Sequence, residues 1–128
     1  HVDPEAGWFP HYLGFAVERG AGPGEGANLN VPLAPGTDDD GWLAGIDVLV
    51  EAARQHGSEA LVVPLGVDAA AGDPEAPLAV TATGFREAGR RLGSLELPTV
   101  LVQEGGYDLA TIGPLVRELL EGLEEAMG

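Results

Sequence analysis

The chain has 128 residues, 45% of them hydrophobic, which is enough for one domain with a buried core. A net charge of −15 and six arginines that form no basic patch argue against nucleic-acid binding. Cysteine is absent, which excludes disulfides and thiolate metal sites, and no apolar run approaches the roughly 20 residues of a membrane span. The first stretch is polar and turn-rich, so we expect no signal peptide and a cytoplasmic protein.

Residues 1–27 are rich in glycine and proline and show little periodicity, which predicts an ordered loop or a flexible lid. Within them, GAGPGEGAN (residues 20–28) superficially suggests phosphate binding. No strand leads into this stretch, no helix follows it, and Glu25 would repel an anion. We therefore predict a surface loop there.

The histidines raise the question of a metal site near the beginning of the chain. The spacing of His1, Asp3 and His11 matches no common zinc arrangement, so surface histidines are the simpler interpretation. His56 lies near a predicted helix C-terminus, where a cation suits the helix dipole.

The next segment predicts a short strand, a turn and a helix. NLNVPL (28–33) is typical of a strand, and the aspartates at 38–40 are placed to cap a helix over 42–56 that Gly57 ends. Its inward face is expected to hold Leu43, Ile46, Leu49, Val50 and Ala53.

Beyond this helix, strands and helices alternate. We predict a buried strand over 60–65, a helix over 82–92 capped by Thr81, a strand over 98–102 and a helix over 114–126. Such alternation favours an α/β fold with a parallel sheet, and residues 28–128 form this alternating part of a single domain spanning 1–128. The inward residues of the two helices are expected to be Phe85, Ala88, Leu92, Ile112, Leu115, Val116, Leu119, Leu120 and Leu123.

Two polar residues follow predicted strands. Asp68 comes after the strand at 60–65, and Tyr107 comes after Gly105 and Gly106 beyond the next strand. Ligands of parallel sheets bind beside the carboxyl ends of the strands, so both side chains would face one crevice if these strands are neighbours. A buried carboxylate needs a partner, which leaves a capped turn or a metal open for Asp68. Tyr107 is either an oxyanion donor or a half-buried turn residue.

Four stretches, in this order, resemble the zinc-dependent histone deacetylase superfamily, and most of all its bacterial acetylpolyamine amidohydrolase-like branch. They are HVDP…WFP (1–10), GEGANLNVPLAPGT (24–37), LVVPLGVDAAAGDP (61–74) and LPTVLVQEGGYDL (97–109). The resemblance spans essentially the whole chain. It implies an arginase/deacetylase-like fold of three αβα layers around a mainly parallel sheet, and an enzyme that removes acetyl or acyl groups from acetylated polyamines or acetyl-lysine.

The resemblance also assigns roles to individual residues. It makes Asp68 one of three Zn²⁺ ligands and Tyr107 the catalytic residue that polarises the scissile carbonyl. Phe9 would line the substrate tunnel, and Gly105 and Gly106 would lie beside Tyr107 at its floor. An acidic rim would suit a cationic polyamine or lysine substrate.

Other parts of the family's site have no counterpart in this sequence. The remaining zinc ligands, an Asp and a His, and the tandem histidines that handle the attacking water are expected upstream of His1. The chain is therefore expected to be the C-terminal portion of a deacetylase domain and to be inactive alone. Alternatives are a non-catalytic fragment or a binding module that keeps the fold without a complete metal site. Half of a doubly covered sheet leaves an apolar edge, which the missing N-terminal half or a second copy is expected to cover.

Overall fold

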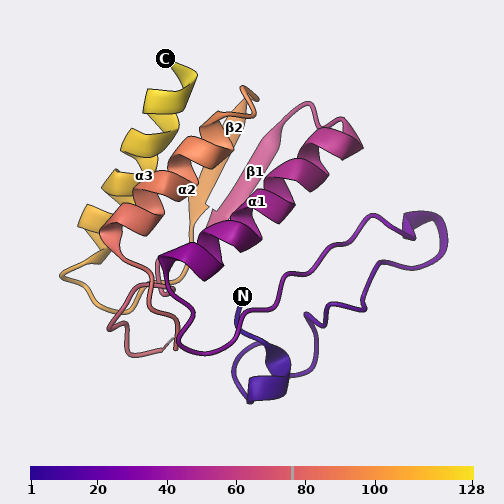
Figure 1. Cartoon of the computed structure of the whole chain (residues 1–128), viewed down its shortest axis with the longest axis horizontal. Coiled ribbons are helices and arrows are strands. Elements are labelled where there is room, and N and C mark those ends of the chain that lie inside the picture. The colour runs from indigo at the N-terminus through magenta and orange to yellow at the C-terminus, as the bar shows by residue number, and fades with distance from the viewer. Residues whose placement is uncertain (76) are drawn as a thin grey trace.

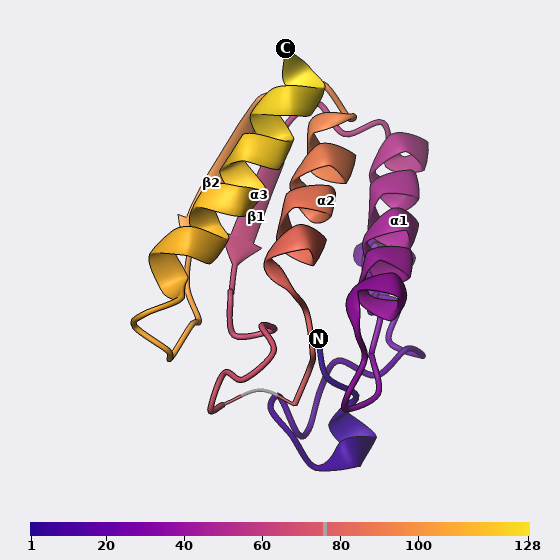
Figure 2. The ribbon, with the colours of Figure 1, turned by 60° about the vertical axis from the view of Figure 1, so that its left-hand side comes forward.

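The computed structural model describes residues 1–75 and 77–128, which form two parallel strands and a layer of three α-helices (Figure 1). Two short 3₁₀ turns, η1 (Pro4–Ala6) and η2 (Gly22–Gly24), precede them. The main elements follow in the order α1 (Asp39–His56), β1 (Leu61–Leu65), α2 (Ala82–Gly93), β2 (Thr99–Gln103) and α3 (Ile112–Met127). Figure 2 shows the three helices side by side on one face of the strands. The predicted α/β class with parallel pairing is confirmed, and the described residues contain two of the three expected layers.

Local capping signals determine where α1 begins and ends. The carboxylate of Asp38 accepts a hydrogen bond from the backbone N–H of Gly41 (3.3 Å), and Gly57 ends the helix in the left-handed conformation with φ 72°. The helix begins at Asp39 rather than at residue 42, because the two aspartates after the cap form its first turn. Acidic side chains are favourable there, next to the positive end of the helix dipole.

Helices α2 and α3 also begin at recognisable signals. The hydroxyl of Thr81 accepts from the N–H of Gly84 (3.4 Å), as the sequence predicted. Helix α3 begins at Ile112, slightly before the predicted start at Pro114. A proline is tolerated in the first turn, where its missing N–H has no intrahelical partner to lose.

Strands β1 and β2 pair in parallel, with Leu61 opposite Thr99 and Leu65 opposite Gln103. Helix α2 provides the crossover between them. Side chains alternate between the two faces of a sheet, and on the helical face Leu65 and Leu101 pack into the core. The carboxyl ends of both strands therefore lie at the same edge.

The other face of the sheet is bare within the described residues. Val62, Val100 and Val102 expose 66%, 58% and 47% of their surface, and Pro64 is exposed beside them. The prediction of a fully buried strand over 60–65 is therefore wrong for Val62 and Pro64. The strand is apolar on both sides, as strands covered on both faces are, but only one side is covered here.

The predicted strand over 28–33 is also wrong, and the described sheet has no strand before α1. Only an isolated bridge forms there, between Val2 and Leu33, with the N–H of Leu33 donating to the carbonyl of His1 (2.8 Å). Pro32 cannot donate to a ladder, and the side chain of Asn30 turns back to the carbonyl of Phe15 (3.0 Å).

Two residues of the predicted apolar stripes lie outside the core. Leu49 of α1 and Leu120 of α3 are exposed, whereas Val50 and Leu119, their chain neighbours, are buried. Successive residues of an α-helix point about 100° apart, so both members of such a pair rarely face the same neighbour.

Among the described residues, no helix has the length and apolar character needed to cross a membrane.

The core lies between α2, α3 and the sheet and anchors the loop that follows β1. Phe85 is fully buried, and the ring of Trp42 packs against it with centroids 5.2 Å apart. Val67 and Val80, near the two ends of that loop, are buried in the same cluster as Leu119. The loop is thereby fixed to the core on both sides.

Glycines allow α2 and α3 to approach each other closely. A methyl group at Gly89 would overlap the backbone at Leu119, with the N of Leu123 at 2.8 Å, and one at Gly93 would lie 2.6 Å from the carbonyl oxygen of Leu123. Gly122 of α3 occupies the reciprocal position against α2. The two backbones therefore touch at three points where no other residue fits.

Replacing Gly122 by alanine is expected to destabilise the protein. Its new methyl group would overlap the carbonyl of Arg86, with the carbonyl carbon at 2.9 Å, and this backbone cannot move independently of α2. Overpacking typically costs about 1–3 kcal/mol and occasionally more, and an overlap with backbone atoms that cannot move belongs to the upper part of this range, above the gain in helix propensity of about 1 kcal/mol. Urea unfolding would measure the change.

Gly45→Ala is the matched control, since Gly45 is also buried within a helix. Its methyl group would meet only side-chain atoms, of Val31 at 3.3 Å and of Leu33 at 3.7 Å, and these side chains can shift. Equal stability losses for Gly45→Ala and Gly122→Ala would contradict the close-packing explanation.

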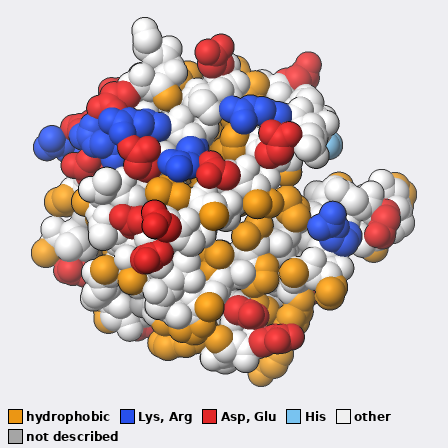
Figure 3. All heavy atoms as spheres, viewed as in Figure 1, with side chains coloured by type: hydrophobic (Ala, Val, Ile, Leu, Met, Phe, Trp, Pro, Cys, Tyr) orange, Lys and Arg blue, Asp and Glu red, His pale blue; other side chains and the backbone are white. Residues whose placement is uncertain are grey.

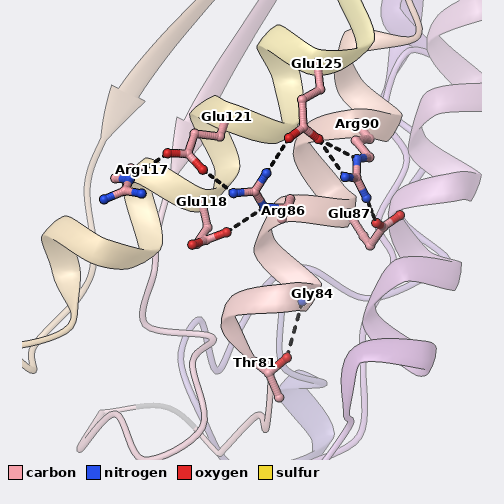
Figure 4. A network of polar contacts seen from close by, with 9 residues as sticks. All are labelled: Thr81, Gly84, Arg86, Glu87, Arg90, Arg117, Glu118, Glu121 and Glu125. Carbon is pink, nitrogen blue, oxygen red and sulfur yellow. Dashed lines mark hydrogen bonds and ion pairs between the residues drawn. The ribbon is translucent and has the colours of Figure 1, made fainter.

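An ion-pair network covers the outside of the α2–α3 contact. Arg86 of α2 pairs with Glu118 (2.7 Å), Glu121 and Glu125 of α3 (Figure 4). Arginine and acidic side chains are interleaved over this part of the surface in Figure 3. The network also includes Glu87, Arg90 and Arg117. A single exposed ion pair contributes little to the free energy of folding. The contribution of these pairs therefore comes from linking the two helices at several points.

Acid is expected to weaken this network through Glu121. The hydrogen bond from Arg117 (2.6 Å), followed by the nearby charges of Arg117 and Arg86, lowers the pKa of the Glu121 carboxyl below its ordinary value of 4.5. A group whose pKa is lower in the folded state stabilises it above the unfolded-state pKa, and this contribution is lost as the pH falls through the folded-state pKa. At pH values below 4.5, the urea concentration at the midpoint of unfolding should therefore decrease, and Glu121→Gln should make this decrease smaller. An unchanged acid response in this variant would contradict the assignment.

Candidate functional site

The candidate site lies where the chain leaves the two strands. Beyond β1 the backbone stays paired with the segment after β2: the N–H of Glu104 donates to the carbonyl of Leu65 (2.8 Å), and the N–H of Val67 donates to that of Gly105 (2.9 Å). The Asp68 loop (residues 66–74) and the Tyr107 loop (residues 104–108) therefore lie side by side, as expected for neighbouring parallel strands.

Two glycines form a socket around the Asp68 carboxylate. A methyl group at Gly66 would lie 2.7 Å from Asp68 Oδ1, and one at Gly105 would overlap Oδ2, with Cγ at 2.8 Å. Neither glycine has a positive φ, so the requirement at both positions is space and not backbone conformation. Gly105, which the resemblance placed beside the tyrosine, thus also contacts the predicted metal ligand.

The electrostatic surroundings of Asp68 suit a cation. The carboxylate is half-buried, and this burial raises the pKa of Asp68, as does the nearby negative charge of Asp73. No ion pair of the described residues involves Asp68. The backbone N–H groups of Asp68 and Ala69 and the charge of the N-terminal ammonium group lower this pKa but offset the effect of burial only in part. A carboxylate that has lost hydration in this way favours a bound metal ion or cationic ligand.

Asp68 has donor chemistry that zinc accepts, but one carboxylate does not make a zinc site. Carboxylate oxygen is an ordinary zinc ligand, and a catalytic zinc takes about three protein ligands. In residues 1–75 and 77–128, no three His, Asp or Glu side chains are arranged to hold a metal ion. The described residues therefore fit a zinc site only as the source of one of its ligands.

Tyr107 follows a constrained turn at the neighbouring strand end. Gly106 has φ 138°, and a methyl group there would lie 2.6 Å from Cγ2 of Val67 and 3.2 Å from Cγ1 of Ile112. Both conformation and space therefore require glycine. The backbone N–H of Tyr107 donates to Oδ2 of Asp73 (2.8 Å), and its side chain is 55% exposed, which leaves the phenol accessible to a ligand.

A cavity of about 400 Å³ opens beside Asp68 and Gly105. Phe9 lines it and is 81% exposed, and the aromatic rings of Trp8 and Trp42 add to the apolar wall. The acidic side chains on its lining are Asp68, Glu75 and Glu104. Tyr107 is not among the lining residues, so the structure brings Phe9, Gly105 and Asp68 together in one cavity and places Tyr107 on the adjoining loop.

Sequence reasoning missed two residues of this region. Asp73 received no role, although its carboxylate bonds to the backbone of Tyr107, and Gly66 was not recognised as part of the Asp68 socket. A local signal for Asp73 exists, because an aspartate that bonds the N–H two residues ahead, here Glu75 at 2.9 Å, is common in turns. Its bond to residue 107 has no local signal.

The histidines are surface residues, as predicted. His1, His11 and His56 are all exposed, and the ring of His1 donates from Nε2 to the carbonyl of Gly14 (2.8 Å). Asp3 caps η1 through the N–H of Glu5 (2.9 Å).

The glycine stretch at 20–28 lies mainly on the surface, as predicted. Its backbone closes on itself through η2 and the bond from Gly26 N–H to the carbonyl of Arg19 (2.6 Å). This short turn is not the strand–loop–helix arrangement that cradles phosphates.

The sequence matches the family model described as "Histone deacetylase domain" over residues 1–123. It is 38% identical over 128 residues to the acetylpolyamine amidohydrolase of Burkholderia pseudomallei (strain 1710b), a match that covers 100% of this chain and 37% of that protein. It is 39% identical over 126 residues to acetylpolyamine amidohydrolase 1 of Pseudomonas aeruginosa, covering 98% of this chain and 36% of that protein.

Solved structures show the same likeness in three dimensions. The crystal structure of an acetylpolyamine aminohydrolase from Burkholderia pseudomallei matches with a TM-score of 0.95 and 38% identity, over 100% of this chain and 37% of that one. The HDA15 HD domain matches with a TM-score of 0.87 and 29% identity, over 98% and 36% of the two chains. The chain thus spans little more than a third of the length of these relatives.

Proposed function

Because this chain belongs to the histone deacetylase family, we propose that it forms part of a zinc-dependent amidohydrolase that removes acetyl or acyl groups from acetylated amines. The observation that carries this proposal is the Asp68 carboxylate, held in a socket of two glycines beside the Tyr107 loop. A capped turn alone does not require such a socket.

In this proposal the residues of the chain have distinct tasks. Asp68 would supply one zinc ligand, and the other two, an Asp and a His, would come from polypeptide outside this chain. Bound zinc supplies a Lewis acid and lowers the pKa of water. The Tyr107 hydroxyl would donate a hydrogen bond to the oxyanion that develops on the amide carbonyl, and Phe9 would grip the acyl-bearing chain in the apolar part of the cavity.

The charge of the chain favours a cationic substrate. The net charge is −15, and Glu75 and Glu104 line the cavity together with Asp68. Acidic groups around a site attract and orient amines. An acetylated polyamine or an acetyl-lysine side chain, as the names of the relatives indicate for those proteins, fits this charge.

The bare face of the sheet supports a role as part of a larger assembly. Val62, Val100 and Val102 present apolar surface beside two strand edges that are unpaired within the described residues. We propose that the remaining part of the deacetylase domain, or a second copy of the chain, covers this surface. A soluble, well-behaved monomer of the isolated chain in sedimentation would contradict this. The chain alone, with one zinc ligand, is expected to hydrolyse nothing.

Removal of the metal tests the proposed reaction. The complete enzyme should release acetate from acetylated polyamines or acetyl-lysine peptides, lose this activity in a chelator, and regain it when zinc is added back. Activity that persists after zinc has been removed, with metal content measured in the same sample, would contradict a zinc-dependent mechanism.

A further inference from the structure

Asp73 links the loop that carries the predicted metal ligand to the loop that carries the predicted catalytic tyrosine. Its Oδ2 accepts from the backbone N–H of Tyr107 at 2.8 Å, across 34 positions of sequence. Its other oxygen, Oδ1, accepts from the N–H of Glu75 at 2.9 Å. Both carboxylate oxygens are thus used, and neither contacts a side chain donor among the described residues.

The Asp68 loop holds Asp73 firmly enough to act as an anchor. The N–H of Asp73 donates to the carbonyl of Ala70 (3.1 Å), and Ala70 forms a parallel bridge with buried Val80. The carboxylate therefore projects from a turn that is tied to the core.

Tyr107 needs such an anchor because two glycines precede it. Glycine restricts the backbone less than any other residue does, and the φ of 138° at Gly106 is one that other residues rarely adopt. The bond from Val67 N–H to the carbonyl of Gly105 fixes the first glycine. In the described residues, the carboxylate of Asp73 is the acceptor for the N–H of Tyr107 itself.

We propose that Asp73 is a positioning residue for Tyr107, holding the backbone from which the phenol reaches the substrate carbonyl. This inference rests on the proposed function, since it assigns Asp73 a part in the reaction that Tyr107 assists. The same bond ties the Asp68 loop to the Tyr107 loop, so that the proposed metal ligand and the proposed oxyanion donor keep fixed positions relative to each other.

Positioning predicts a specific kinetic pattern for Asp73→Ala in the complete enzyme. A displacement of about 1 Å in a catalytic group costs on the order of 100-fold in rate, so kcat should fall about 10- to 100-fold. KM and zinc content should stay nearly unchanged, because Asp73 is not a proposed zinc ligand and does not line the cavity. Asp73→Asn keeps an oxygen that can accept from Tyr107 and should recover part of the rate.

A double-mutant cycle with Tyr107→Phe distinguishes positioning from a general loss of structure. If Asp73 acts through the hydroxyl of Tyr107, adding Asp73→Ala to Tyr107→Phe should change kcat by less than about 2-fold, whereas independent effects would multiply. Asp3→Ala is the control, since Asp3 makes the same local bond to the N–H two residues ahead (2.9 Å) without a bond to Tyr107.

The outcomes separate this inference from the proposed function. If Tyr107→Phe is impaired but the Asp73→Ala effect multiplies with it, appears in KM, or accompanies zinc loss, Asp73 is not a positioning residue for Tyr107. If the wild type does not deacetylate, or Tyr107→Phe keeps the full rate, the proposed function fails and this role fails with it. A non-additive loss in kcat, with zinc retained and partial rescue by Asp73→Asn, supports the inference.

Discussion

Asp68→Ala is expected to remove bound zinc from the complete enzyme and to reduce deacetylation to the background rate. The carboxylate occupies a socket formed by Gly66 and Gly105, and its burial raises its pKa, so a bound metal ion would compensate for the hydration that it has lost. Loss of an outer-shell group already costs about 10- to 100-fold in metal affinity, and loss of a direct ligand should cost more. Metal analysis after dialysis and initial rates would measure both effects.

The control for this experiment is Asp40→Ala, which removes the same charge from an exposed position in the first turn of α1. It should keep zinc and activity. If Asp68→Ala retains full zinc content and rate, the assignment of Asp68 as a ligand is wrong, and the capped-turn interpretation of this residue becomes the better one.

Tyr107→Phe is expected to lower kcat about 10²- to 10³-fold, the usual effect of removing one oxyanion donor, or about 2.7–4 kcal/mol of transition-state stabilisation. The phenylalanine keeps the ring and the backbone bond to Asp73, so the loop should keep its conformation. Zinc content should be unchanged, since the hydroxyl is not expected to be a ligand. Steady-state kinetics with metal analysis tests both statements.

Tyr12→Phe provides a matched control, because Tyr12 is 91% exposed and lies on the N-terminal segment outside the candidate cavity. The two variants lose the same atom and should differ by the full effect of the oxyanion donor. Loss of zinc from Tyr107→Phe would mean that the tyrosine helps to hold the metal site, and equal rates for both variants would exclude its catalytic role.

Local signals in the sequence were enough to predict the helices. Asp38 and Thr81 cap α1 and α2, and Gly57 ends α1, because a cap is made between residues only a few positions apart. The order of apolar strand and amphipathic helix likewise predicted a parallel sheet, since a strand–helix–strand unit closes that way. That β1 and β2 are direct neighbours was left open by the sequence and is shown by the structure.

The same local reasoning failed where burial depends on distant neighbours. The composition of β1 is apolar throughout, but whether Val62 is buried depends on what packs on its face of the sheet, and within the described residues nothing does. The predicted strand at 28–33 failed because its backbone bonds to the N-terminal segment and not to a neighbouring strand. Strand pairing is a non-local contact, and composition reports it only indirectly.

The sequence by itself determined the family, through four motifs in the expected order, and placed Asp68 and Tyr107 after the ends of two successive strands. Only the tertiary structure decided how these residues are held. The socket of Gly66 and Gly105 and the bond from Tyr107 to Asp73 join segments more than thirty positions apart. Such contacts exist because parallel pairing brings the carboxyl ends of the two strands together. The distances between side chains at that edge of the sheet cannot be derived from the spacing of residues in the sequence.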